Sequence, residues 1–279
     1  YIARSVNDVL SAVVIMNNLS ELYATENRNN ETIALIHEAL HLLIPFFSAK
    51  DVLVNPTRQQ IVAVSNVHLL FVLLDNKAEA MLGLVKNGVD SVFKKRTMET
   101  FLLADYVIDE LRRKQSGLQS KLFWSNETRN FYHLAIEASY LANDPASMLY
   151  FMEKSRAVLL NDKLNEVGSL AFLPAAEAEQ EQQLRINIAG LEKQKEALNE
   201  MDTAYSRVSQ TLLDAKEDFN RYIKTLETKF PVYYQYKYNT YVPSINDIRD
   251  KLLTRGQTYL SFFETDSLIY ALLISKGNL

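Results

Sequence analysis

The residues best suited to chemistry in this sequence are two histidines and a glutamate in the string His-Glu-Ala-Leu-His at 37–41. On a helix, side chains four residues apart lie one turn apart on the same face, so that both imidazoles can bind one zinc ion. In zinc peptidases with this motif, the glutamate is the general base. A catalytic zinc also needs a third protein ligand. The local extended form of the motif would require Gly at 44 and His at 47, where this chain has Ile44 and Phe47.

A remote carboxylate, such as Glu79 or Glu99, could supply the third ligand, although nothing in the surrounding sequence marks either one. The alternative is that the histidines flank an ordinary packing helix. Its apolar stripe would be Ile33, Ile36, Leu40 and Leu43. We therefore assign no catalytic, cofactor-binding or metal-binding residue and keep a zinc peptidase centred on His37, Glu38 and His41 as an alternative.

The sequence contains no cysteine, which excludes disulfides, thiolate zinc sites and a cysteine nucleophile within these residues. A chain without cysteine fits a reducing compartment, and we expect a cytoplasmic protein. The remaining histidines, His68 and His133, stand beside apolar stripes and are expected to be surface or helix-packing residues. Trp124 and Phe123 are expected to anchor helix packing.

The composition favours helices and protein partners. The 279 residues include only 7 Gly and 6 Pro, too few for the many turns of an all-β or doubly wound fold. The 30 basic and 34 acidic side chains are mixed along the chain and give a net charge of -4, which argues against a surface for nucleic acid or anionic membrane. The longest apolar run, Leu69 to Leu74, is far shorter than the roughly 20 residues of a membrane span. We therefore expect a protein partner, no nucleic acid and no membrane.

In residues 1–171, apolar residues recur at the three- and four-residue spacing of amphipathic helices. The periodic segments are 6–23, 33–47, 65–88, 91–114, 121–142 and 145–166, with Ser65 as the expected N-cap of the third. Such helices joined by short turns predict hairpins stacked in a tetratricopeptide-like (TPR-like) α-solenoid. The repeat is too blurred to align to a strict consensus, so that the spacing by itself fits a solenoid or an irregular bundle.

The helix expected at 145–166 has two apolar faces. One face carries Met148, Phe151, Ser155 and Val158, and the other carries Leu149, Met152, Leu160 and Leu164. A helix that is apolar on two sides is expected to pack between two neighbours.

Residues 172–230 are rich in helix-forming residues and contain no proline between Pro174 and Pro231. Apolar residues keep coiled-coil spacing along 184–198 and 208–226, and residues 199–201 can turn before Asp202 caps a second helix. We expect a long antiparallel, coiled-coil-like helical hairpin whose arms each span roughly 40 Å. Such an arm either stabilises the neighbouring helices or projects to dock a partner.

In residues 231–279, a linker helix is followed by a change from helix to strand pattern at Thr258. The runs 258–263 and 268–275 are rich in β-branched and aromatic residues and flank a turn at 264–267, which predicts a β-hairpin. Because an isolated two-stranded hairpin is marginally stable in water, we expect further strands of the same sheet after Leu279. We also expect residues before Tyr1.

Several stretches carry a family resemblance. They are KAEAML at 77–82, TFLLADYVIDELRRK at 100–114, FWSNETRNFYHLAIEASYL at 123–141, FMEKSRAVLLNDKLNE at 151–166, LETKFPVYYQYKY at 226–238 and YLSFFETDSLIYALLISKG at 259–277. In content and order, the chain from about residue 30 onward resembles the tetratricopeptide-linked CHAT proteins, in which a caspase-like peptidase domain follows helical repeats. The Glu-Lys-Ser-Arg-Ala string at 153–157 is the most family-like piece.

The resemblance implies that 259–277 is the first hairpin of a CHAT domain and that the catalytic His and Cys follow later in the protein. No residue of this chain inherits a catalytic role. We therefore expect a non-catalytic segment that binds a protein partner and regulates a caspase-like cysteine peptidase. The zinc peptidase at 37–41 and a helical scaffold without any peptidase stay open as alternatives.

Overall fold

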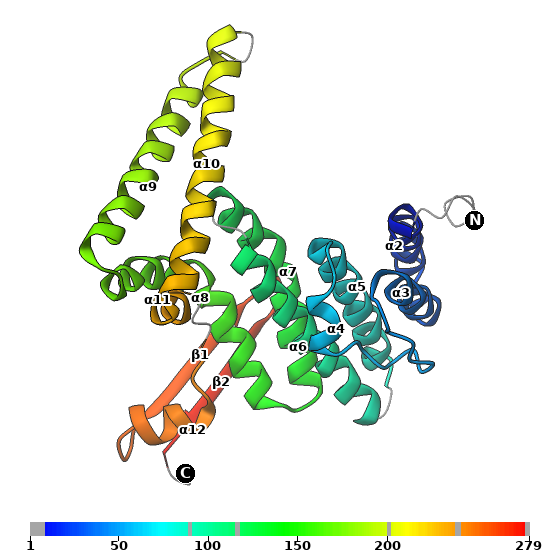
Figure 1. The fold of residues 1–279 in the computed structure, drawn as a ribbon. Coiled ribbons are helices and arrows are strands. Elements are labelled where there is room, and N and C mark those ends of the chain that lie inside the picture. The colour runs from blue at the N-terminus through cyan, green and yellow to red at the C-terminus, as the bar shows by residue number, and fades with distance from the viewer. Residues whose placement is uncertain (1–8, 89–90, 115–117, 200–201, 238–240, 277–279) are drawn as a thin grey trace. The chain divides into compact units, whose positions relative to one another are not determined.

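The computed structural model describes residues 9–88, 91–114, 118–199, 202–237 and 241–276, with the backbone alone at 113–114, 118–127 and 157–167. The chain is mainly α-helical with a short antiparallel two-stranded sheet near its C-terminal end (Figure 1), which confirms the expected fold class. It divides into two compact units. Unit 1 comprises Tyr1–Gln115, Phe123–Arg156 and Val242–Leu279, and unit 2 comprises Ser116–Leu122 and Ala157–Tyr241.

The helices of the first 169 residues are separated by only a few residues each, apart from the longer connection before α4. They are α2 (Val9–Thr25), α3 (Asn29–Leu43), α4 (Arg58–Val62), α5 (Val67–Lys86), α6 (Ser91–Lys114), α7 (Leu118–Leu141) and α8 (Pro145–Ser169), of which α7 and α8 extend from unit 1 into unit 2. Within unit 1, α2 packs on α3, α3 on α5, and α5 on α6. These four helices thus bury their apolar stripes against one another.

The expected N-cap of α5 was wrong by one residue. Asn66, not Ser65, occupies the cap position, and its side-chain oxygen accepts a hydrogen bond from the Leu69 backbone N–H at 3.0 Å. Asparagine caps helices as well as serine does, so that the backbone path decides which of two adjacent capping residues is used.

Phe131 on α7 is central to the core of unit 1. The centroid of its ring lies 5.8 Å from that of Phe71 on α5 and 5.7 Å from that of Phe101 on α6. It also lies 6.4 Å from the ring of Phe151 on α8. Aromatic pairs at such distances add to the stabilisation that comes from burial of their apolar surface. One ring therefore joins side chains from four helices.

The hairpin consists of β1 (Thr258–Glu264) and β2 (Ile269–Ser275), paired from Thr258 with Ser275 to Glu264 with Ile269. Both strands lie within one residue of their predicted limits. The backbone N–H of Thr265 donates to the Leu268 carbonyl at 2.8 Å, and the Thr265 hydroxyl accepts from the Leu268 N–H at 2.9 Å. This threonine therefore closes the turn. The short helix α12 (Ile245–Asp247) and a π-helical turn (Ile248–Leu252) precede the strands.

One face of the hairpin packs on α8. Leu149 of α8 forms a buried cluster with Ile248, Leu253 and Ile274, and Tyr259 and Leu272 pack against it. Phe151, on another side of α8, is buried beside Phe131 and Tyr132. The helix is therefore covered on two sides, as its two apolar faces predict.

Some of the predicted packing residues lie outside the described side chains. They are Val158, Leu160 and Leu164 of α8, together with Phe123 and Trp124.

Unit 2 contains η1 (Leu170–Phe172) and a long antiparallel pair, α9 (Ala175–Glu196) and α10 (Thr203–Lys229), followed by α11 (Pro231–Lys237) (Figure 1). Its buried cluster consists of Phe219, Ile223, Leu226 and Tyr233, with Leu184 and Ile188 of α9 packed against it. Arg185 lies over the Phe219 ring, with 5.0 Å between the guanidinium carbon and the ring centroid. The pair is thus held by an apolar seam near α11 and by contacts of charged side chains along its length.

Phe151→Ala is expected to lower the free energy of unfolding by about 3–5 kcal/mol, because it leaves a cavity beside Phe131 and Tyr132. Chemical denaturation measures this loss. Phe46→Ala is the matched control, since Phe46 is 95% exposed, and its effect should stay within about 0.5 kcal/mol. A loss below about 1 kcal/mol for Phe151→Ala would contradict the packing of α8 between two neighbours.

Candidate functional site

The structure buries the first histidine of the 37–41 string. The Nε2 atom of His37, on α3, lies 2.7 Å from the carbonyl oxygen of Ala49, so the ring donates a hydrogen bond from this nitrogen. The ring centroids of His37 and His41 are 4.4 Å apart, and the Phe47 ring stands edge-on to them at 5.4 and 5.0 Å. His37 therefore packs against the loop after α3, whereas the sequence predicted a place on the helix flank.

Of the carboxylates considered as partners of His37 and His41, two are exposed to solvent and one forms an ion pair with an arginine. Glu38 and Glu79 are exposed, and Glu99 pairs with Arg96 on its own helix at 2.9 Å. Within the described residues, no group of three His, Cys, Asp or Glu side chains is arranged to hold a metal ion. Burial lowers the pKa of His37, and the positive charge of Lys77 adds to this effect, while the hydrogen bond to Ala49 opposes it. The geometry thus favours a neutral packing histidine at position 37.

Among the side chains that the structure describes, buried charge is concentrated between α6 and α8. Lys154 on α8 donates to both carboxylate oxygens of Asp109 on α6, at 2.8 and 2.6 Å. The Lys154 Nζ atom also lies 3.5 Å from Oδ2 of Asp105, one turn earlier on α6. All three residues are buried, and Arg112 contributes a second cation 3.6 Å from Asp109. Two acidic and two basic side chains thus neutralise one another inside unit 1.

Two tyrosine hydroxyls complete this ion network at Asp105. Tyr132 on α7 donates to Oδ1 at 3.0 Å, and Tyr150 on α8 donates to Oδ2 at 2.5 Å. Burial raises the pKa of Asp105, and the charge of Lys154 opposes the rise. Burial and the nearby Asp105 raise the pKa of both tyrosines, so that their hydroxyls stay protonated and keep donating. Both oxygens of Asp105 and of Asp109 are therefore hydrogen-bonded, as buried carboxylates require.

The same turn of α8 that carries Lys154 also contacts the hairpin. Glu153 accepts a hydrogen bond from the Tyr259 hydroxyl at 2.9 Å. Arg156 donates from a guanidinium nitrogen to the carbonyl oxygen of Phe262 and pairs with Glu153 at 3.0 Å. Leu149, Glu153 and Arg156 are spaced by four and three residues and so share one side of the helix, roughly opposite Lys154. The Glu-Lys-Ser-Arg string thus binds α6 from one side and β1 from the other.

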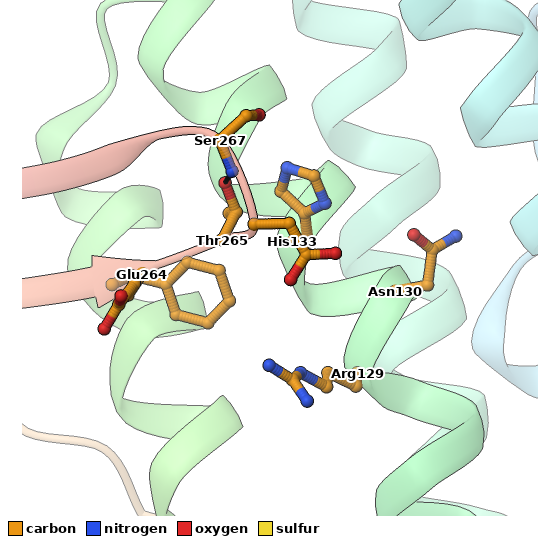
Figure 2. Close-up of a pocket in the computed structure, with 8 residues that line it drawn as sticks. Arg129, Asn130, His133, Glu264, Thr265 and Ser267 are labelled. Carbon is orange, nitrogen blue, oxygen red and sulfur yellow. Dashed lines mark hydrogen bonds between the residues drawn. The ribbon is translucent and has the colours of Figure 1, made fainter.

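An open groove of about 530 Å³ lies between α7 and the hairpin turn (Figure 2). Arg129, Asn130 and His133 line it from α7, and residues 263–267 line it from the turn. The His133 ring stacks on that of Phe263 with 6.5 Å between centroids. The groove offers charged and hydrogen-bonding groups for polar contacts. The Thr265 hydroxyl, which lines the groove, donates to the Leu268 carbonyl at 3.0 Å.

A second buried cation, Lys77 on α5, holds the loop between α3 and α4. Its Nζ atom donates to the Val54 carbonyl and to Oδ1 of Asn55, both at 3.0 Å. The Asn55 amide in turn donates to the Thr100 hydroxyl on α6 at 2.8 Å. Burial lowers the pKa of Lys77 to about 7. Lys77 is the first residue of the KAEAML stretch.

Sequence reasoning missed the ion network and Lys77. One signal was present, since Asp105 and Asp109 stand four residues apart in an otherwise apolar part of α6, where they share a side. Their partner Lys154 is 45 positions beyond Asp109. Only the packing of α6 against α8 brings the two together.

A scan against protein-family models, a search of curated proteins and a search of solved structures found no match to the chain. Along the described residues, each helix is too short or too polar to cross a membrane. The functional argument therefore rests on the contacts described above and on the resemblance of the quoted stretches.

Lys154→Met is expected to lower the free energy of unfolding by about 3–5 kcal/mol, because it leaves two buried carboxylates without their cation. Lys251→Met is the matched control. Lys251 pairs with Asp247 at 2.5 Å, but its side chain is 72% exposed, and such surface pairs contribute at most about 1 kcal/mol. Similar losses for the two variants in urea denaturation would contradict the buried ion network.

Lys77 should make the stability of the chain rise with pH above neutrality. The folded chain has a Lys77 pKa of about 7, against 10.5 for an ordinary lysine in the unfolded chain. Between these values the unfolded chain binds the proton and the folded chain does not, so that the free energy of unfolding rises by up to about 1.4 kcal/mol per pH unit. Urea denaturation of the native chain and of Lys77→Met, from neutral to mildly alkaline pH, measures this slope. Only the native chain should show it, and parallel profiles would contradict the burial of a titrating lysine.

Proposed function

We propose that this chain is the non-catalytic, protein-binding segment of a TPR-linked CHAT protein, in which helical repeats regulate a caspase-like cysteine peptidase domain. The observation that carries the proposal is the hairpin, which is anchored to α8 on one face and open on the other. Residues 259–277 resemble the first hairpin of a CHAT domain, so we assign this open face to the sheet of that domain.

The outer face of the hairpin is apolar. Leu260 pairs directly with Leu273, and Phe262 with Ala271, so that these side chains share one side of the sheet. The large side chains on this face, Leu260, Phe262, Ile269 and Leu273, are between 48% and 67% exposed. Within the described residues, β1 and β2 pair only with each other. An apolar face beside unpaired strand edges supports a hairpin that belongs to a larger sheet.

The contacts of α8 support a regulatory role for the helices. Three family-like stretches meet at this helix, since Asp105 and Asp109 belong to 100–114, Lys154 belongs to 151–166, and Tyr259 opens 259–277. A partner that shifts α6 against α8 would act on Lys154 and, through the next residues of the same turn, on β1. This is a physical route by which binding at the repeats can alter the sheet that follows them.

The expected partner of the helical repeats is a protein in the cytoplasm. The balanced charge and the absence of cysteine support this part of the proposal. Neither nucleic acid nor a membrane surface is part of the proposed function.

The decisive experiment compares the 279-residue chain with a form of the protein that carries a complete CHAT domain after it. Both are incubated with a peptide library, with and without the protein partner, a thiol alkylator or a metal chelator. The chain alone should cleave nothing, because it has no cysteine to form a thiolate nucleophile. The longer form should cleave peptides in a reaction that the alkylator abolishes.

Two results would overturn the proposal. Cleavage by the 279-residue chain that resists alkylation but stops with the chelator would favour the zinc peptidase at His37, Glu38 and His41, and His41→Ala should then abolish it. A longer form that lacks a catalytic His and Cys would leave a helical scaffold without peptidase activity.

A further inference from the structure

The pairing of β1 with β2 determines which backbone groups of the hairpin point away from it. In an antiparallel pair, residues that bond to the partner strand alternate with residues whose N–H and C=O groups point to the other side of their strand. The backbone hydrogen bond from Thr265 to Leu268 closes the turn and sets the phase of this alternation. The outward-pointing residues include Leu260 and Phe262 on β1 and Ile269, Ala271 and Leu273 on β2.

The edge of β1 is covered by α8. Glu153 accepts a hydrogen bond from the Tyr259 hydroxyl, and Arg156, three residues further along α8, donates to the carbonyl of Phe262, three residues further along β1. The helix thus follows β1 towards the turn. Because the Phe262 carbonyl points outward, Arg156 occupies the place that the N–H group of a neighbouring strand would need.

The edge of β2 is open. Within the described residues, the outward N–H and C=O groups of Ile269, Ala271 and Leu273 form no hydrogen bond. The side chains of Ile269 and Leu273 are 67% and 55% exposed. A row of donors and acceptors at backbone spacing is a template for an extended polypeptide, because only another strand matches all of them.

The composition of β2 is that of an interior strand. Its seven residues, Ile-Tyr-Ala-Leu-Leu-Ile-Ser, carry no charge and no proline, and its register with β1 contains no bulge. Charges, prolines and bulges are the devices by which edge strands avoid further pairing. β1 ends in Glu264 and has Arg156 at its edge. The strand that lacks protection is therefore β2.

We propose that the sheet grows from β2 and that the occupant of this edge is a strand of the CHAT domain. The inference rests on the proposed function and adds which strand of the hairpin is joined. The new strand pairs with Ile269, Ala271 and Leu273 and places apolar side chains beside them on the outer face, while Arg156 keeps it from β1. The competing occupant is a helix laid across the outer face, which would leave both edges without a partner strand.

Amide hydrogen exchange, measured residue by residue, tests which edge is joined. The 279-residue chain is compared with the longer form that carries a complete CHAT domain. The N–H groups of Ala271 and Leu273 should exchange roughly 100-fold or more slowly in the longer form than in the chain alone. Those of Leu260 and Phe262 should exchange alike in both. Added protection on β1 in place of β2 would overturn the proposal, and so would unchanged exchange on both strands, the result expected of a covering helix.

Leu273→Pro and Leu260→Pro are a matched pair of variants, because the two leucines face each other on the outer face and both N–H groups point outward. Proline removes this N–H group and leaves the hydrogen bonds between β1 and β2 in place. In the longer form, Leu273→Pro should lower the midpoint of thermal unfolding by several degrees more than Leu260→Pro. In the 279-residue chain the two variants should have the same small effect. An equal or larger loss for Leu260→Pro in the longer form would contradict growth from β2.

The exchange results are separate from those of the cleavage experiment. A longer form that cleaves peptides while the N–H groups of Ala271 and Leu273 stay unprotected would contradict growth from β2 and leave the proposed function standing. Protection of these groups in a longer form that cleaves nothing would support growth from β2 and contradict the peptidase assignment.

Discussion

The pairing of Lys154 with Asp105 and Asp109 constrains how α8 lies on α6. Apolar side chains tolerate small shifts, because one methyl group can replace another in a contact, but a buried ammonium group must keep its carboxylate partners. Tyr132 and Tyr150 add two directional hydrogen bonds to Asp105. The network therefore sets both the rotation and the axial position of α8, while the aromatic cluster around Phe131 supplies apolar contacts to the same helix.

The orientation of α8 in turn determines where the hairpin binds. With Lys154 directed at α6, helical geometry places Leu149, Glu153 and Arg156 together on roughly the opposite side. Those three residues make the apolar and polar contacts to the hairpin. The hairpin would be marginally stable by itself in water. Its contact with α8 stabilises one face, and its outer face still exposes Leu260, Phe262, Ile269 and Leu273.

The histidine pair at 37–41 shows what helical spacing decides and what it leaves to other elements. The two imidazoles do lie side by side, as a helix requires of residues four apart. Their surroundings come from the loop after α3, where the Phe47 ring stands against both imidazoles and the Ala49 carbonyl engages His37. A metal site depends on ligands from other elements, and the local motif does not specify those.

The sequence by itself determined the mainly α-helical fold, the long antiparallel helical pair and the C-terminal hairpin, because periodic apolar spacing and turn residues act over short distances along the chain. It also predicted that α8 is covered on two sides. Only the tertiary structure decided that Lys154 meets Asp105 and Asp109, that Lys77 holds the loop before α4, and that His37 is buried. The residues in each of these contacts are at least 12 positions apart in the sequence, and Lys154 is 45 positions from Asp109. A polar residue beside an apolar stripe carries the same local pattern whether it faces solvent or a buried partner. The packing of one helix on another is what distinguishes the two.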